Sequence, residues 1–155
     1  MNNTLIVIVK FLHDLFTAIW IGGLFLITLS LFPALKKTFG HSAESEKVMD
    51  AVMQRQGKWV MLSIIGLAVT GILLARSSGR MTGLMRFDSS YTSLLTVKHL
   101  LMILMVTIAL TRFFGFRKLE KQANMNRKKI SLLLMHLNTF LGVLALLLSA
   151  ITAVT

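Results

Sequence analysis

LIVIVKFLHDLFTAIWIGGLFLITLSLF, residues 5–32, is an apolar run with only three charged or titratable side chains. A helix needs about 20 consecutive apolar residues to cross the hydrocarbon core of a bilayer, and this run is longer. A secretory signal has a shorter apolar region and a small-residue cleavage site, which does not follow here. The stretch therefore predicts a retained transmembrane helix over residues 4–32, which Pro33 ends because proline cannot continue a helix.

Further apolar stretches predict three more transmembrane helices, over residues 59–75, 93–114 and 130–154. The polar segment over residues 42–56 has apolar residues at helical spacing, which indicates an amphipathic helix on the membrane surface; they are Val48, Met49, Val52 and Met53. We expect an all-α, integral membrane four-helix bundle that forms one domain over residues 1–155.

The composition excludes several classes of protein. The chain is 55% hydrophobic and only 15% charged, whereas about a quarter of the residues of a soluble domain are charged. The net charge is +11, and most of the basic residues lie between the apolar stretches. Such residues are typical of cytoplasmic loops that contact lipid head groups. No basic soluble domain remains that could bind nucleic acid. The absence of cysteine excludes disulfides, thiolate metal sites and iron–sulfur clusters.

Lysine and arginine are distributed unequally over the two sides of the predicted bundle. Twelve of them lie between the first and second or between the third and fourth helices, against three on the opposite side, Arg76, Arg80 and Arg86. Cytoplasmic loops carry the excess of positive charge. We therefore expect a multi-pass protein of the cell (inner) membrane, in contact with membrane lipid, with both termini outside the cytoplasm.

Titratable side chains within the predicted spans are the candidate functional residues, because each costs several kcal/mol in lipid unless it has a partner. The alternative is that each one only joins neighbouring helices by hydrogen bonds. They are Lys10, His13 and Asp14 in the first span, Lys98 and His99 in the third, and His136 in the fourth. Counted from the helix ends, His13 and His99 share a level in the outer half, and His136 lies in the opposite half.

Two imidazoles at one level of a helix bundle form an axial clamp for a b-type haem. An aromatic stripe that includes Trp20 shares the face of His13 and suits a macrocycle, and Lys10 on that face reaches a propionate or a lipid phosphate. The same histidines also suit copper, with Met102 as a soft thioether ligand, although methionines more often fill cores. On the cytoplasmic side, His136 and Arg112 suggest a polar site for a quinone head group or a second haem.

Several short motifs resemble the CopD-like membrane proteins, named for copper resistance protein D. The motifs are HDLFTAIWIGG at residues 13–23, followed by Pro33, then Arg55, VTG at residues 69–71 and YTSLLTVKHLLMILM at residues 91–105. This resemblance implies copper handling in the cell envelope. A wider resemblance to the HemJ-type protoporphyrinogen oxidases implies that His13 and Lys98 belong to a haem or porphyrin site.

Four functions stay open at this point. The preferred hypothesis is a small membrane cytochrome with His13 and His99 as axial ligands, which exchanges electrons with a quinone or a periplasmic redox protein. The rivals are a copper permease that uses His13, His99 and Met102, a protoporphyrinogen oxidase, and a purely structural subunit. Whether the chain is an enzyme, such as a haem-dependent oxidoreductase, and whether it forms a homo-oligomer are open.

Overall fold

The computed structural model describes residues 2–40, 42–77, 90–116 and 125–154. Within these ranges every element is a helix, as the hydropathy pattern predicts, and four helical segments are long and apolar enough to cross a membrane. These spans are Asn3–Phe39, Ala43–Ser77, Ser93–Gly115 and Lys129–Thr152. The all-α fold class and the four membrane-spanning helices are thereby confirmed.

The first span is a continuous helix in five parts. They are α1 (Asn3–Thr17), the π-helical η1 (Ala18–Gly22), α2 (Gly23–Phe25), the π-helical η2 (Leu26–Leu31) and α3 (Phe32–Phe39). The expected end at Pro33 is not what the structure shows, because the helix continues to Phe39. A new α-helical part begins at Phe32, so Pro33 stands in its first turn, where the missing N–H of proline costs little.

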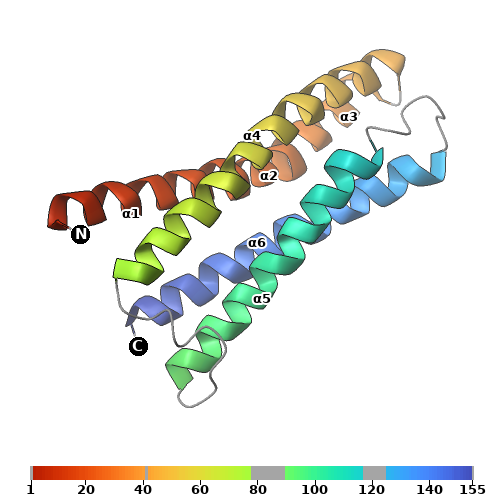
Figure 1. Ribbon diagram of the computed structural model, residues 1–155. Helices are drawn as coiled ribbons and strands as arrows, with labels where there is room; N and C mark the ends of the chain where they lie inside the picture. The colour runs from red at the N-terminus through yellow and green to blue at the C-terminus, as the bar shows by residue number, and fades with distance from the viewer. Residues whose placement is uncertain (1, 41, 78–89, 117–124, 155) are drawn as a thin grey trace.

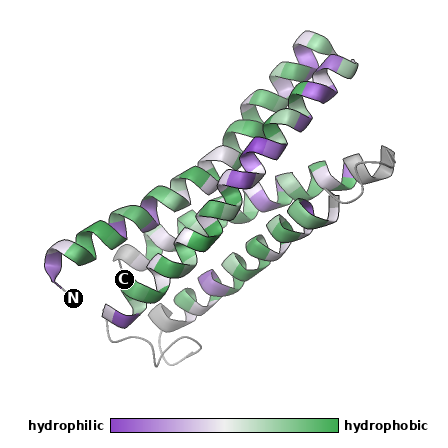
Figure 2. Cartoon of the chain, turned by 45° about the horizontal axis from the view of Figure 1, so that its top comes forward, coloured by the Kyte–Doolittle hydropathy of each residue, from purple (hydrophilic) through white to green (hydrophobic). Residues whose placement is uncertain are grey.

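The remaining spans are long helices. They are α4 (Ala43–Ser77), α5 (Ser90–Leu110) with the π-helical η4 (Thr111–Phe116), and α6 (Met125–Val154). The segment expected to lie separately on the membrane surface is instead the first part of α4. Hydrophilic residues gather in this first half of α4, whereas hydrophobic ones dominate its second half (Figure 2).

The helices form two antiparallel pairs, α1 with α4 and α5 with α6 (Figure 1). Both chain ends lie at the same end of the bundle as the last turn of α4 and the first turn of α5 (Figure 1); we call this half the terminal half. All four spans contribute to the core, and its largest fully buried side chains are Trp20, Ser63, Met105, Met135 and Asn138. Only 22–33% of each apolar window is buried, so most of the apolar surface is left for lipid.

Candidate functional site

His13 is a half-buried residue of α1 that bonds across to α4. Its Nδ1 lies 2.9 Å from Oγ1 of Thr70, and that hydroxyl donates to the carbonyl oxygen of Gly66 at 2.6 Å. A hydroxyl has one proton to donate, so Thr70 accepts the bond from His13. The imidazole therefore carries its proton on Nδ1, and the lone pair of its Nε2 is free to bind a metal or a proton.

Small residues on α4 let the rings of α1 approach its backbone. The ring of Phe16 lies directly against Gly66, and Cε1 of His13 lies 3.7 Å from where a Cβ on Gly71 would stand. Helices in lipid pack closely where such small residues occur. The imidazole is thus held against α4, by the hydrogen bond to Thr70 and by close packing at Gly71.

Lys98 on α5 is a charged residue from another span that lies within electrostatic range of His13. It is half-buried and within electrostatic range of both His13 and Asp14. Met102 follows one turn later on the same face of α5 and packs against the core. The terminal half of the bundle therefore places an imidazole, an amine and a thioether on inward-facing parts of two helices.

His99 and His136 have a different environment. Both are exposed, and each ring bonds the carbonyl oxygen four residues earlier on its own helix, His99 to Leu95 at 2.7 Å and His136 to Leu132 at 2.8 Å. His136 also meets the ring of Phe32 edge to face, with ring centroids 6.1 Å apart. Neighbouring residues on a helix point about 100° apart, and on α5 it is Lys98, not His99, that turns inward.

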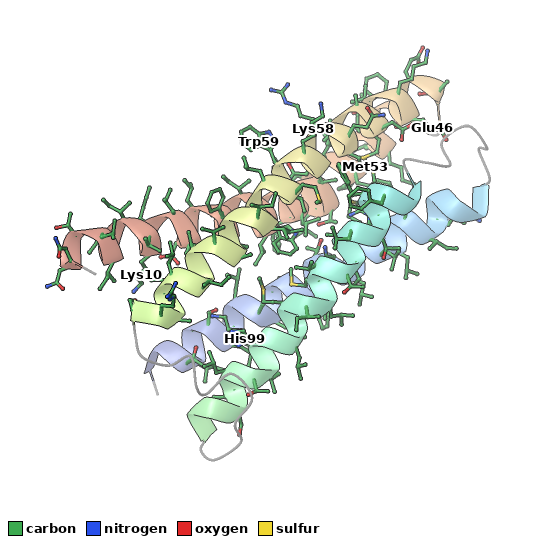
Figure 3. All side chains as sticks on the ribbon, in the orientation of Figure 1. Lys10, Glu46, Met53, Lys58, Trp59 and His99 are labelled. Carbon is green, nitrogen blue, oxygen red and sulfur yellow. The ribbon has the colours of Figure 1, made fainter. Side chains whose placement is uncertain are left out.

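The other side chains differ in how far they are exposed. Trp20 is 1% exposed and lies in the core on η1. Lys10 is exposed on α1, near the end of the bundle where His99 also lies (Figure 3). Lys58 and Trp59 project from α4 away from the other helices (Figure 3). Of the residues proposed for a cofactor, His13 and Lys98 are both half-buried and within electrostatic range of each other.

A second set of polar groups was only partly foreseen. Within the described ranges, four residues hold buried polar atoms that have no hydrogen-bond partner: Trp20, Ser63, Arg112 and Asn138. Arg112 belongs to the polar site that the sequence suggested with His136, whereas Asn138 was not singled out there. Ser63 gave no signal, because serine is common in membrane helices.

The chemistry of the site limits what it can bind. Among the described residues no three His, Cys, Asp or Glu side chains form a group that could hold a metal ion. A metal at His13 therefore needs ligands of another kind, such as the Met102 thioether, and a thioether favours a soft ion.

The comparison with protein families finds one match. A family model described as copper resistance protein D matches residues 50–153, more than half of the chain. The match includes Arg55 and the motifs at residues 69–71 and 91–105, whereas the motif at residues 13–23 and Pro33 lie before it. No curated protein and no solved structure matches the chain.

Proposed function

The chain belongs to the copper resistance protein D family, and on this premise we propose that it takes up copper ions as its cargo in the terminal half of the bundle. The observation that carries the proposal is the hydrogen bond from His13 to Thr70, which leaves Nε2 of the imidazole free. With its proton fixed on the other nitrogen and its ring held by a neighbour, a histidine is prepared for metal binding.

Met102 supplies the second ligand in this proposal. It lies one turn below Lys98 on the inward face of α5, and its thioether suits copper(I), which prefers soft ligands. The chain has no cysteine, so a thioether is the softest ligand available. Lys98 is a positive charge beside the site, and it lowers the affinity so that the ion can leave again.

The positive-inside rule puts the terminal half of the bundle outside the cytoplasm. Copper would then enter from the periplasmic side of the cell membrane. This placement agrees with copper handling in the envelope, where the ion arrives from outside the cell.

Copper binding by matched histidine variants tests the proposal. We expect the detergent-purified protein to bind copper(I) in competition with a chromophoric chelator, and His13→Gln to lose most of that binding. His99→Gln is the control, because it makes the same change on an exposed ring of the third span. Equal copper binding by wild type and His13→Gln, or equal losses in both variants, would overturn the proposal.

One observation favours a second candidate, a haem or porphyrin site. The structure brings Lys98 near His13, and these are the two residues that the HemJ-type resemblance implies. The absorption spectrum of the same preparation separates the candidates. A Soret band that disappears in His13→Gln and Lys98→Gln, together with oxidation of protoporphyrinogen, would replace copper by this function. A band lost in His13→Gln and His99→Gln would instead support the bis-histidine cytochrome.

A further inference from the structure

Arg112 lies at the start of η4, in the half of the bundle away from the chain ends, and has no counter-ion among the described residues. Its Nε is buried and has no hydrogen-bond partner in these ranges. The sequence contains no aspartate or glutamate in residues 90–116 or 125–154, which make up α5, η4 and α6. A cation inside a membrane protein is costly unless an opposite charge or hydrogen bonds offset its lost hydration.

Asn138 on α6 is a second buried group without partners. It is 1% exposed, and neither its amide nitrogen nor its amide oxygen has a hydrogen-bond partner among the described residues. A buried amide with no bonds costs about 1–3 kcal/mol. Native proteins satisfy nearly all such groups with protein, water or a bound ion.

The two residues lie on facing sides of α5 and α6. The buried residues Met105, Ile108 and Ala109 lead to Arg112 at helical spacing. On α6, Asn138 belongs to the buried face that also contains Gly142. Both side chains therefore point to the inside of this helix pair.

Their levels along the bundle also agree. The methyl carbon of Met105 lies 3.4 Å from where a Cβ on Gly142 would stand, which aligns these two positions. Arg112 comes seven residues after Met105 and Asn138 four residues before Gly142, and because the two helices are antiparallel, both lie on the same side of that level. At a rise of 1.5 Å per residue, Arg112 is about 10 Å and Asn138 about 6 Å away from it. Helical side chains lean toward the N-terminus of their helix, so the guanidinium leans back to the level of Asn138.

We propose that Arg112 and Asn138 together bind a small inorganic anion, such as chloride, inside the bundle. The guanidinium supplies a positive charge and an N–H, and the amide supplies further N–H donors, which suits an acceptor of negative charge. A cation there would be repelled by Arg112. A small ion also suits a site where Asn138 is almost completely shielded from the lipid.

The heat stability of the purified full-length protein tests this site. The melting temperature is measured in sodium chloride and in sodium gluconate at equal ionic strength. We expect chloride to raise it in a saturable manner, by about 3 °C or more. Arg112→Gln and Asn138→Leu are expected to lose this rise. Arg55→Gln is the matched control, because Arg55 is exposed on α4, and it is expected to keep the rise.

Two results would overturn the proposal. One is the same wild-type melting temperature in both salts, with Asn138→Leu more stable than wild type in each, which would identify the amide as an ordinary unsatisfied group. The other is a phospholipid that stays bound in native mass spectrometry and is lost in Arg112→Gln, which would assign the guanidinium to a lipid phosphate. If Arg112→Gln does not fold, Asn138→Leu decides the result, because leucine has nearly the same volume and no charge is lost.

Discussion

Nδ1 of His13 and Oγ1 of Thr70 lie 2.9 Å apart, and this bond joins the first two spans through residues that are 57 positions apart in the chain. The bond does more than hold α1 against α4. It selects the imidazole tautomer, because the Thr70 hydroxyl already donates its own proton to Gly66. The copper proposal depends on this selection, since a metal takes the ring nitrogen that has no proton.

Thr70→Val tests the role of this hydroxyl. Valine keeps the shape of the side chain but cannot accept the bond, so the ring is free to turn and to exchange tautomers. We expect copper(I) affinity to fall by about 10- to 100-fold, measured by chelator competition. Thr70→Ser keeps the hydroxyl and should retain most of the affinity; a normal affinity in Thr70→Val would show that the bond is only structural.

Lys98→Gln tests the charge beside the site, because it removes the charge without adding a thioether that could bind copper(I). Removing one positive charge from the neighbourhood of His13 should strengthen copper binding by roughly 3- to 30-fold, given the size of charge interactions in partly buried positions. Lys98→Arg keeps the charge and should leave the affinity near that of wild type. Weaker copper binding in Lys98→Gln would mean that the amine is itself a ligand and would contradict its assigned role.

Met102→Leu and Met105→Leu separate ligand from core methionines. Met105 is fully buried, so its exchange for leucine should cost less than about 1.5 kcal/mol of stability and leave copper affinity unchanged. Met102→Leu should lower copper(I) affinity at least about tenfold, because the thioether is lost. The copper affinity of each variant is measured by titration and its stability by thermal melting. Equal affinities in the two variants would remove Met102 from the ligand set.

Gly66→Ala tests the close contact of α1 with α4. A Cβ at this position would overlap the ring of Phe16, so we expect a loss of about 1–3 kcal/mol, the usual cost of overpacking, seen as a lower melting temperature. The double variant with Phe16→Leu should recover part of it. Gly22→Ala is the control, because no atom lies within 4 Å of its new Cβ; an equal loss there would contradict this explanation.

Hydropathy alone was enough to predict the fold class, because four long apolar stretches leave few other structures possible in a membrane. Helix boundaries were harder. Proline normally ends a helix, yet Pro33 falls in the first turn of α3, behind a π segment that no sequence pattern announces. The polar first part of α4 joins its apolar second part without a breaker, so composition suggested two segments where one helix forms.

The sequence predicted the levels of the candidate site residues along the bundle but not which side of each helix faces inward. Residue counts place His13, Lys98 and His99 at similar levels, and the structure has Lys98 within electrostatic range of His13. Which of two adjacent residues turns inward depends on the rotation of α5 about its axis. That rotation is set by packing against α6, where Met105 meets Gly142. The hydropathy pattern of the sequence does not specify it.

The π-helical segment η1 (Ala18–Gly22) also has a consequence for changes in chain length. A π turn bonds each residue to one further along than an α turn does and so accommodates an additional residue. A deletion inside an ordinary α-helix rotates everything beyond it by about 100°. Loss of one residue from η1 can instead be absorbed as that turn rewinds to an α-helix, which leaves the imidazole before it and the core after it in phase. This membrane helix thus has a place where one residue can be lost without the cost that a deletion has in the α-helical parts of the same span.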